Sequence, residues 1–264
     1  MSPDDLLAHQ DNGRYWPDWP APLFTDAAQA YRAALAVRER RIARGERPVG
    51  FKVGFTNRTI WPRYGVYAPV WGTVWDTTFV QCADAGRLSL ADTCEPRLEP
   101  ECVFGLRATP RADAGLDDLF DALEWVAPGF ELVQSHRIGW RFSAAETIAD
   151  NGLHARLLVG ARRPVRELAR HAHELHTLLA QATIDLLRGD QPVERGNGAH
   201  VLDSPLAALQ HFVRELRRCP GAPDLAAGDM VTTGTWTDAW PVRPGERWHA
   251  RFSAPLPALS VHLE

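Results

Sequence analysis

The middle of the chain consists of short apolar runs separated by turns, with helical patterns at both ends of it. The 20 glycines and 20 prolines are consistent with many turns and short elements. The 264 residues contain no internal repeat and no low-complexity linker, so they suit one large domain. This pattern predicts an α+β protein with one β core, in which residues 1–48 form an N-terminal helical segment and residues 49–264 form the β-rich part.

Hydrophobic periodicity and turn signals locate the expected elements. Helices are expected at residues 26–44, 116–126, 143–152 and 204–216. Strands are expected at residues 49–55, 97–106, 130–133 and 157–160 and in the tail from Gly228, and a turn-rich stretch is expected at 57–75. Residues 167–187 carry mixed signals, and we interpret them as helix to about His173 and strand from about Leu179.

Charge and hydropathy exclude several classes of protein. The net charge is −4 and no basic run is present, so nothing favours binding to nucleic acid. Residues 1–16 lack the pattern of a secretory signal, and no stretch approaches the roughly 18 apolar residues that a membrane span needs. The four cysteines have no C-x-x-C spacing and are expected to be reduced. We therefore expect a cytoplasmic protein with neither nucleic acid nor membrane as a partner.

Two glutamates, Glu99 and Glu101, stand two residues apart in the strand expected at 97–106. Side chains two apart on a strand point to the same face. Because neighbouring like charges repel, this face is expected to meet water or a cation. A third carboxylate, Glu131, lies in the apolar run Phe130–Val133, where an unpaired charge would be costly.

Three carboxylates with no histidine or cysteine beside them describe a site for a hard cation such as Mg²⁺ or Mn²⁺. Such a site would leave about three positions of an octahedron open, and a substrate that chelates through two oxygens, such as a 2-oxo acid, would fill two of them. The other interpretation is an ordinary solvated strand face, on which Glu-x-Glu pairs are common. The residues alone leave both interpretations open.

Lys52 lies between two apolar residues and is flanked by Gly50 and Gly54. The glycines would let backbone or ligand approach closely, and a lysine in an apolar setting can transfer protons. The alternative is a lysine on an edge strand that points to water and protects against aggregation.

Taken in order and spacing, several segments resemble those of the 2-keto-4-pentenoate hydratase and 4-oxalocrotonate decarboxylase family of the fumarylacetoacetate hydrolase superfamily. The resemblance covers about residues 30–264. The matching segments are Gly50–Thr56 (G-F-K-V-G-F-T), Trp71–Asp76, Pro96–Glu101 (P-R-L-E-P-E), Leu123–Val133, Ile148–Asn151 (I-A-D-N), Arg195–Gly198 and Ala227–Thr235. The sequence departs from the family pattern after the third glutamate, where Gln134-Ser135-His136 stands in place of a segment that usually ends in arginine.

The resemblance implies a mixed β-roll over residues 49–264 with peripheral helices, usually in homo-oligomers. It implies Mg²⁺ or Mn²⁺ bound by Glu99, Glu101 and Glu131. Lys52 and Asp76 would be catalytic residues, Lys52 as proton donor or acceptor. The substrate-binding residues it implies are Ser135 and Thr233.

The activity implied is a metal-dependent hydratase that adds water to a 2-hydroxy-2,4-dienoate, giving a 4-hydroxy-2-oxo acid in the catabolism of aromatic ring-cleavage products. The same site would suit a 2-oxo-3-enedioate decarboxylase. A C–C hydrolase of acylpyruvates would need a water-activating base, for which His9 is not a convincing candidate. An inactive metal-binding partner subunit is the alternative that is not an enzyme.

Overall fold

The computed structural model describes residues 1–18 and 20–264. The α-helices are α1 (Pro3–Asp11), α2 (Ala27–Ala43), α3 (Trp61–Tyr64), α4 (Leu116–Ala122), α5 (Ala144–Ala149), α6 (Val165–Leu168), α7 (Ala172–Gln181) and α8 (Pro205–Arg218). The strands of the first half are β1 (Pro48–Gly54), β2 (Val70–Trp75), β3 (Phe79–Gln81), β4 (Ala85–Leu88), β5 (Arg97–Leu106) and β6 (Leu123–Val133). Those of the second half are β7 (His154–Val159), β8 (Arg163–Pro164), β9 (Thr183–Arg188), β10 (Gln191–Asn197), β11 (Met230–Thr235), β12 (Trp240–Pro241), β13 (Arg247–Phe252) and β14 (Leu259–Leu263).

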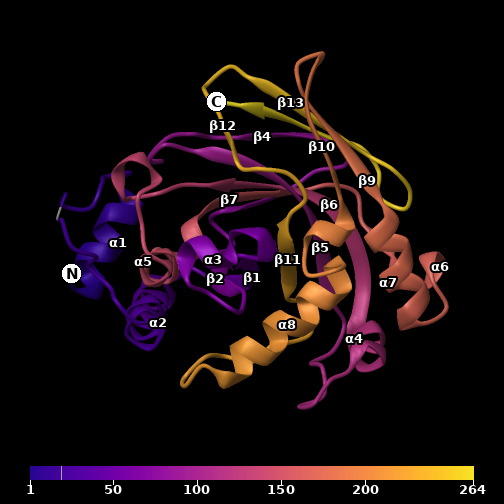
Figure 1. Ribbon diagram of the computed structural model, residues 1–264, viewed down its shortest axis with the longest axis horizontal. Helices are drawn as coiled ribbons and strands as arrows, with labels where there is room; N and C mark the ends of the chain where they lie inside the picture. Colours follow the sequence, from indigo (N-terminus) through magenta and orange to yellow (C-terminus); the bar gives the residue numbers. More distant parts are fainter. Residues whose placement is uncertain (19) are drawn as a thin grey trace.

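Two mixed sheets form the β core. The larger sheet has the order β2-β1-β11-β5-β6-β7-β3, with β12 paired to β5 and β8 paired to β6. The smaller sheet has the order β10-β9-β13-β14-β4. The pairs β1–β11, β3–β7 and β14–β4 are parallel and the others antiparallel. Helices lie around the sheets (Figure 1), so the architecture confirms the predicted α+β class with peripheral helices.

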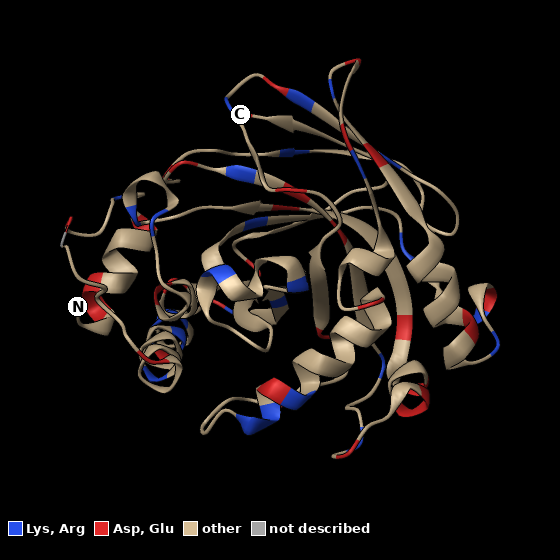
Figure 2. Ribbon diagram, in the orientation of Figure 1, with Lys and Arg blue, Asp and Glu red and all other residues tan. Residues whose placement is uncertain are grey.

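The long strands β5 and β6 pair along their whole length and form the centre of the larger sheet. Their residues are almost all buried. One face packs against helices and the smaller sheet, and the other packs against residues of the same larger sheet, such as Val74 of β2 and Met230 of β11. One large apolar cluster joins these strands to α4, α7 and α8. Figure 2 shows charged residues on helices, such as the C-terminal end of α8, and on strands of the smaller sheet, whereas β11 is free of them.

The N-terminal helices pack at one end of the molecule, beside α5 (Figure 1). Leu6 of α1 and Val37 of α2 share an apolar cluster with Ile148 of α5. Among the described residues, no helix is long and apolar enough to cross a membrane.

The helix expected at 26–44, the strand expected at 97–106 and the helix opened by Ser143 are confirmed. The helix expected at 116–126 ends at Ala122, and Leu123–Val126 belong to β6. A short apolar run fits a helix or a buried strand equally well, and pairing with β5 decides between them. The helix expected to end near His173 runs instead from Ala172 to Gln181. The patterns missed α1, and β2 lies within the stretch interpreted as turns.

Candidate metal centre

Two neighbouring strands bring three carboxylates together. Glu99 and Glu101 lie on one face of β5, and Glu131 of β6 is the direct cross-strand partner of Glu99. One oxygen of each carboxylate lies within 4.8 Å of the others. Glu101 and Glu131 are fully buried, and Glu99 is partly exposed. Like charges placed directly opposite each other destabilise a sheet, so this arrangement requires a compensating positive charge.

Lys52 of β1 supplies part of that compensation. Its Nζ lies 3.1 Å from Glu131 Oε2 and donates a hydrogen bond to the carbonyl of Gly152 at 2.8 Å. Three carboxylates and one ammonium still leave a net formal charge of about −2. A divalent cation would neutralise this excess, and the all-oxygen donor set suits a hard ion.

An unpaired oxygen gives independent support for a cation. Glu101 Oε2 accepts a hydrogen bond from the backbone N–H of Gly234 at 2.7 Å. Glu101 Oε1 is buried and has no hydrogen-bond partner among the described residues. A buried carboxylate oxygen without a partner is costly, so these residues fit a bound metal.

The charges in this cluster shift the protonation of each member. Burial and the charge of Glu131 raise the pKa of Glu99 to about 7, and burial with both other carboxylates raises the pKa of Glu101 well above its usual range. Burial also acts to raise the pKa of Glu131, but Lys52 and His154 outweigh it and lower that pKa. For Lys52 burial acts to lower the pKa, and the three carboxylates outweigh it, so the amine stays charged. Metal binding would therefore displace protons from the cluster.

His154, the first residue of β7, was not identified from the sequence. Its Nδ1 lies 2.8 Å from Glu131 Oε1 and its Nε2 lies 2.9 Å from the hydroxyl of Thr78. Burial, together with the charges of Lys52 and Arg41, lowers the pKa of His154. The imidazole is then neutral, so Nδ1–H donates to Glu131 and Nε2 accepts from Thr78, an arrangement that fixes the direction of the carboxylate.

Two glycines allow the backbone to approach the cluster. Gly234 has φ +96°, and a Cβ there would lie 1.8 Å from Thr56 Oγ1. Gly152 has φ +65°, and a Cβ there would lie 2.8 Å from the Lys52 side chain. Any larger residue would displace the amide that binds Glu101 or the lysine that pairs with Glu131.

A cavity of about 460 Å³ opens over Lys52 and Glu99. Its volume lies within the range of small-molecule sites, about 300–1,000 Å³. Five aromatic residues also line it: Phe55, Tyr64, Trp140, Phe142 and Trp236. The carboxylate cluster thus lies at the base of a pocket that a small substrate can enter.

Comparison with known proteins places this geometry in a family. The chain is 31% identical over 220 residues to a 4-oxalocrotonate decarboxylase of Pseudomonas sp, covering 83% of this chain and 79% of that protein. It is 32% identical over 212 residues to 2-keto-4-pentenoate hydratase 1 of Dechloromonas aromatica (strain RCB), covering 78% of this chain and 74% of the relative. The chain belongs to the 2-keto-4-pentenoate hydratase and 4-oxalocrotonate decarboxylase family.

Solved structures agree with the fold of this family. The 4-oxalocrotonate decarboxylase from Pseudomonas putida G7, complexed with magnesium and adipate, superposes with a TM-score of 0.85 at 24% identity, covering 100% of this chain and 99% of that one. A fumarylpyruvate hydrolase from Pseudomonas aeruginosa, in complex with Mn²⁺ and pyruvate, gives a TM-score of 0.60 at 18% identity over 81% of this chain and 88% of the other. The fold is therefore the predicted fumarylacetoacetate hydrolase type. No family model matches the chain.

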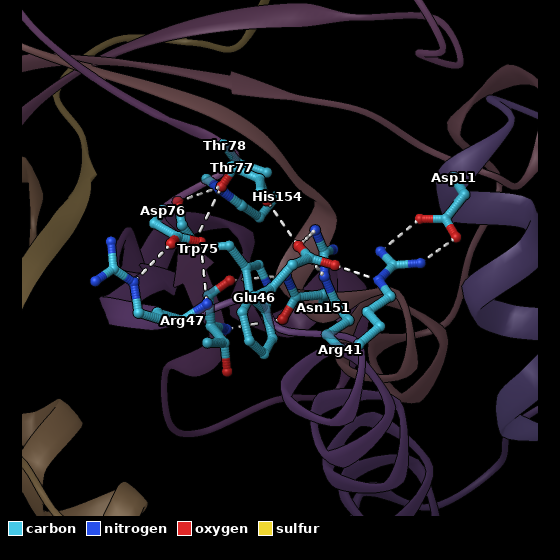
Figure 3. A network of polar contacts seen from close by, with 12 residues as sticks. Asp11, Arg41, Glu46, Arg47, Trp75, Asp76, Thr77, Thr78, Asn151 and His154 are labelled. Carbon is cyan, nitrogen blue, oxygen red and sulfur yellow. Dashed lines mark hydrogen bonds and ion pairs between the residues drawn. The ribbon is translucent and has the colours of Figure 1, made fainter.

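Asp76, predicted from the family resemblance as catalytic, is not brought to the cluster. Its carboxylate accepts hydrogen bonds from the backbone N–H of Arg47 at 3.0 Å and from the Arg47 guanidinium at 2.9 Å (Figure 3). In the β1–β2 pair, Lys52 lies opposite Gly72, whereas Asp76 follows the last paired residue of β2, at the far end of the hairpin. The cavity lining does not include Asp76.

The two predicted substrate contacts of the family have side chains that are hydrogen-bonded to the protein. Thr233 Oγ1 donates to the carbonyl of Cys102 at 2.9 Å, which ties β11 to β5 beside Glu101. Ser135 Oγ donates to the carbonyl of Arg137 at 2.8 Å. Neither residue lines the cavity, whereas Gly234, which follows Thr233, does.

His136, which departs from the family pattern, is a buried partner of the I-A-D-N segment. Its Nδ1 lies 2.6 Å from Asp150 Oδ1, and its ring stacks on Trp16 with centroids 6.1 Å apart. The backbone N–H of Trp16 donates to the His136 carbonyl at 2.7 Å. The substitution therefore joins the N-terminal segment to the end of β6, away from the cavity lining.

Proposed function

We propose that this chain is a divalent-metal-dependent lyase that adds water to a 2-hydroxy-2,4-dienoate and releases a 4-hydroxy-2-oxo acid. The observation that carries the proposal is the triad of carboxylates within 4.8 Å, paired with Lys52 at the base of an open cavity. Relatives support it: one at 28% identity over 220 residues is a 2-hydroxyhexa-2,4-dienoate hydratase of Comamonas testosteroni. We place this hydration reaction in the catabolism of the compounds that form when aromatic rings are cleaved.

Mg²⁺ or Mn²⁺ is the proposed cofactor, with Glu99, Glu101 and Glu131 as its protein ligands. Solved proteins of the same fold hold magnesium, calcium or Mn²⁺. Carboxylate oxygens are preferred by these hard cations, and no soft ligand lies in the triad. When bound, the cation supplies Lewis acidity that stabilises negative charge on a substrate oxygen.

The protein residues have separate roles in proton transfer and in positioning the carboxylates. Lys52 Nζ, held as an ammonium between Glu131 and the Gly152 carbonyl, donates a proton to C5 of the dienol and takes up the proton that the C2 hydroxyl loses, which gives the 2-oxo-3-enoate. Water then adds across the C3–C4 double bond, with its oxygen at C4, which is conjugate to the C2 carbonyl, and its proton at C3. His154 and the Gly234 amide keep Glu131 and Glu101 in place. Thr233 acts indirectly through the β11–β5 contact, and Asp76 has no part in these steps.

A decarboxylase is the second candidate because relatives of similar identity carry that activity in their names. The same site would stabilise the enolate that remains when CO₂ leaves a 2-oxo-3-enedioate. For an acylpyruvate hydrolase, the histidine considered from the sequence, His9, lies in α1 and bonds the carbonyl of Arg14 outside the cavity lining. His200 lines the cavity, and its Nδ1 lies 3.1 Å from the Trp236 carbonyl.

The test is a direct assay of both reactions. Purified protein with Mg²⁺ or Mn²⁺ is incubated with freshly generated 2-hydroxypenta-2,4-dienoate, and the ultraviolet absorbance of the dienol is followed with identification of the product. A metal-dependent fall that yields 4-hydroxy-2-oxopentanoate supports the hydratase. Absence of that product, with CO₂ released from a 2-oxo-3-enedioate, assigns the decarboxylase instead. A protein that binds metal and turns over neither substrate is the inactive partner subunit.

We also propose that the protein forms homo-oligomers in the cytoplasm, as its family resemblance implies. Light scattering on the purified chain tests the assembly, and a monomer at all concentrations would contradict it.

A further inference from the structure

The cavity above the carboxylates is larger than the five-carbon substrate requires. If each non-hydrogen atom takes about the 30 Å³ that a water molecule occupies in the liquid, 2-hydroxypenta-2,4-dienoate, with about eight such atoms, needs about 240 Å³. The cavity measures about 460 Å³. The remaining space is room for about seven further atoms, enough for one six-membered ring.

The walls of that extra space are aromatic. Phe55 and Tyr64 have ring centroids 4.9 Å apart, Tyr64 and Phe142 5.7 Å, and Trp140 and Phe142 5.8 Å. These four residues, the aromatic wall, form a continuous series of contacts, and all four line the cavity. Each is only partly buried by the protein, so apolar ring surface remains open to a ligand.

Backbone conformation is strained at two residues of the aromatic wall. Phe55 has φ +55° and Trp140 has φ +59°. Bulky residues rarely adopt positive φ, and such outliers gather at ligand-binding sites, where the surrounding structure maintains them. Both outliers point to the same cavity, which makes a role in ligand binding the simplest physical reason for keeping them.

Charge around the extra space gives no net attraction to a second carboxylate. Arg63 and Arg97 line the cavity, but so do Glu194 and Asp238. The guanidinium of Arg97 lies over the Trp140 ring at 4.1 Å. Glu194 is fixed by hydrogen bonds from the Asp238 N–H and the indole of Trp240.

We propose that the substrate carries an uncharged, ring-sized apolar tail at C5, which packs against the aromatic wall while the acid head lies at the carboxylate cluster. The inference rests on the proposed function, and it names a 5-aryl-2-hydroxypenta-2,4-dienoate class of substrate. Protonation at C5 and addition of water at C4 leave the tail unchanged, so one reaction serves short and long substrates.

Binding of unreactive 2-oxo acids tests the tail separately from turnover. Calorimetric titration in the presence of Mg²⁺ compares 2-oxo-5-phenylpentanoate, 2-oxopentanoate and 2-oxohexanedioate. The phenyl acid is expected to bind about ten- to hundredfold more tightly than 2-oxopentanoate, the gain from burying one ring. The dicarboxylate is expected to bind no more tightly than 2-oxopentanoate.

Variants of the wall locate the effect. Phe142→Ala is expected to reduce the phenyl preference about tenfold. Tyr67→Ala is the matched control, because Tyr67 lies three residues from Tyr64, is 84% exposed and does not line the cavity. This control is expected to keep the wild-type preference.

Equal affinities for the phenyl and short acids, or tightest binding of the dicarboxylate, would overturn the tail assignment; the second result would assign the arginines to a second carboxylate. A phenyl preference that is undiminished in Phe142→Ala would equally overturn it. A phenyl preference without turnover of any dienoate would instead refute the proposed function and leave the tail assignment standing.

Discussion

Replacing Glu101 by glutamine should stabilise the metal-free protein and remove its response to Mg²⁺. Glutamine keeps the size of the side chain and an oxygen that can accept from Gly234, whose N–H donates to Glu101 Oε2 at 2.7 Å. It removes the ionisable group, so that a third like charge can no longer form beside Glu99 and Glu131. Because burial and the other two carboxylates raise the pKa of Glu101, its ionised form is disfavoured in the metal-free state.

The geometry sets the size of the effect. The carboxylate oxygens lie within 4.8 Å of one another. At an effective dielectric constant of about 20, two unit charges at that separation repel by about 3.5 kcal/mol. Proton uptake and the ion pair with Lys52 relieve part of this repulsion. We therefore expect Glu101→Gln to gain about 1–2 kcal/mol in the free energy of unfolding, or roughly 2–8 °C in Tm for a chain of this size.

Thermal unfolding with EDTA and with Mg²⁺, at about pH 8 where the cluster is most charged, measures both effects. Wild type should unfold at higher temperature with Mg²⁺, and Glu101→Gln should show a higher Tm in EDTA with little further rise on adding the ion. Glu124→Gln, an exposed glutamate on β6, is the matched control and should behave as wild type. A lower Tm for Glu101→Gln in EDTA, or an unchanged response to Mg²⁺, would refute the reasoning.

Three further predictions follow from the same cluster. A carboxyl whose pKa is raised on folding stabilises the metal-free protein at low pH and loses that contribution as pH rises through about 7, the pKa of Glu99. Mg²⁺ affinity measured by calorimetry should therefore increase between about pH 6 and pH 8, and a flat profile would contradict this. Lys52→Met should lower kcat about 10²- to 10⁴-fold while Mg²⁺ still raises Tm; kcat within threefold of wild type would exclude Lys52 as the proton donor. His154→Leu should weaken Mg²⁺ binding about 10- to 100-fold, because Glu131 loses the hydrogen bond that holds its carboxylate in place. An unchanged Kd would show that this bond does not position Glu131.

Local pattern was sufficient for part of the site. Strand periodicity alone places Glu99 and Glu101 on one face, and β5 has the predicted bounds. The apolar setting of Glu131 signals a carboxylate that needs compensation. The register of β5 on β6 then makes Glu131 the direct cross-strand partner of Glu99. Local sequence pattern does not specify this pairing.

Other features depend on contacts between residues far apart in the chain. Leu123–Val126 are strand because β5 offers them a pairing edge, although their composition also fits a helix. Asp76 is the last residue of a segment that resembles a family motif, yet the hairpin geometry directs its carboxylate to Arg47. His154 has no sequence signal, because its role exists only where β7 lies beside Glu131.

The sequence by itself thus determined the family, the α+β class and the identities of the candidate ligands, because these depend on residue type and on spacing along a strand. The tertiary structure alone decided how the charges are balanced, which backbone amide binds Glu101 and which rings line the cavity. Those properties are distances between separate elements. The aromatic wall joins Phe55 and Tyr64 to Trp140 and Phe142, and only packing of the two segments brings their rings together.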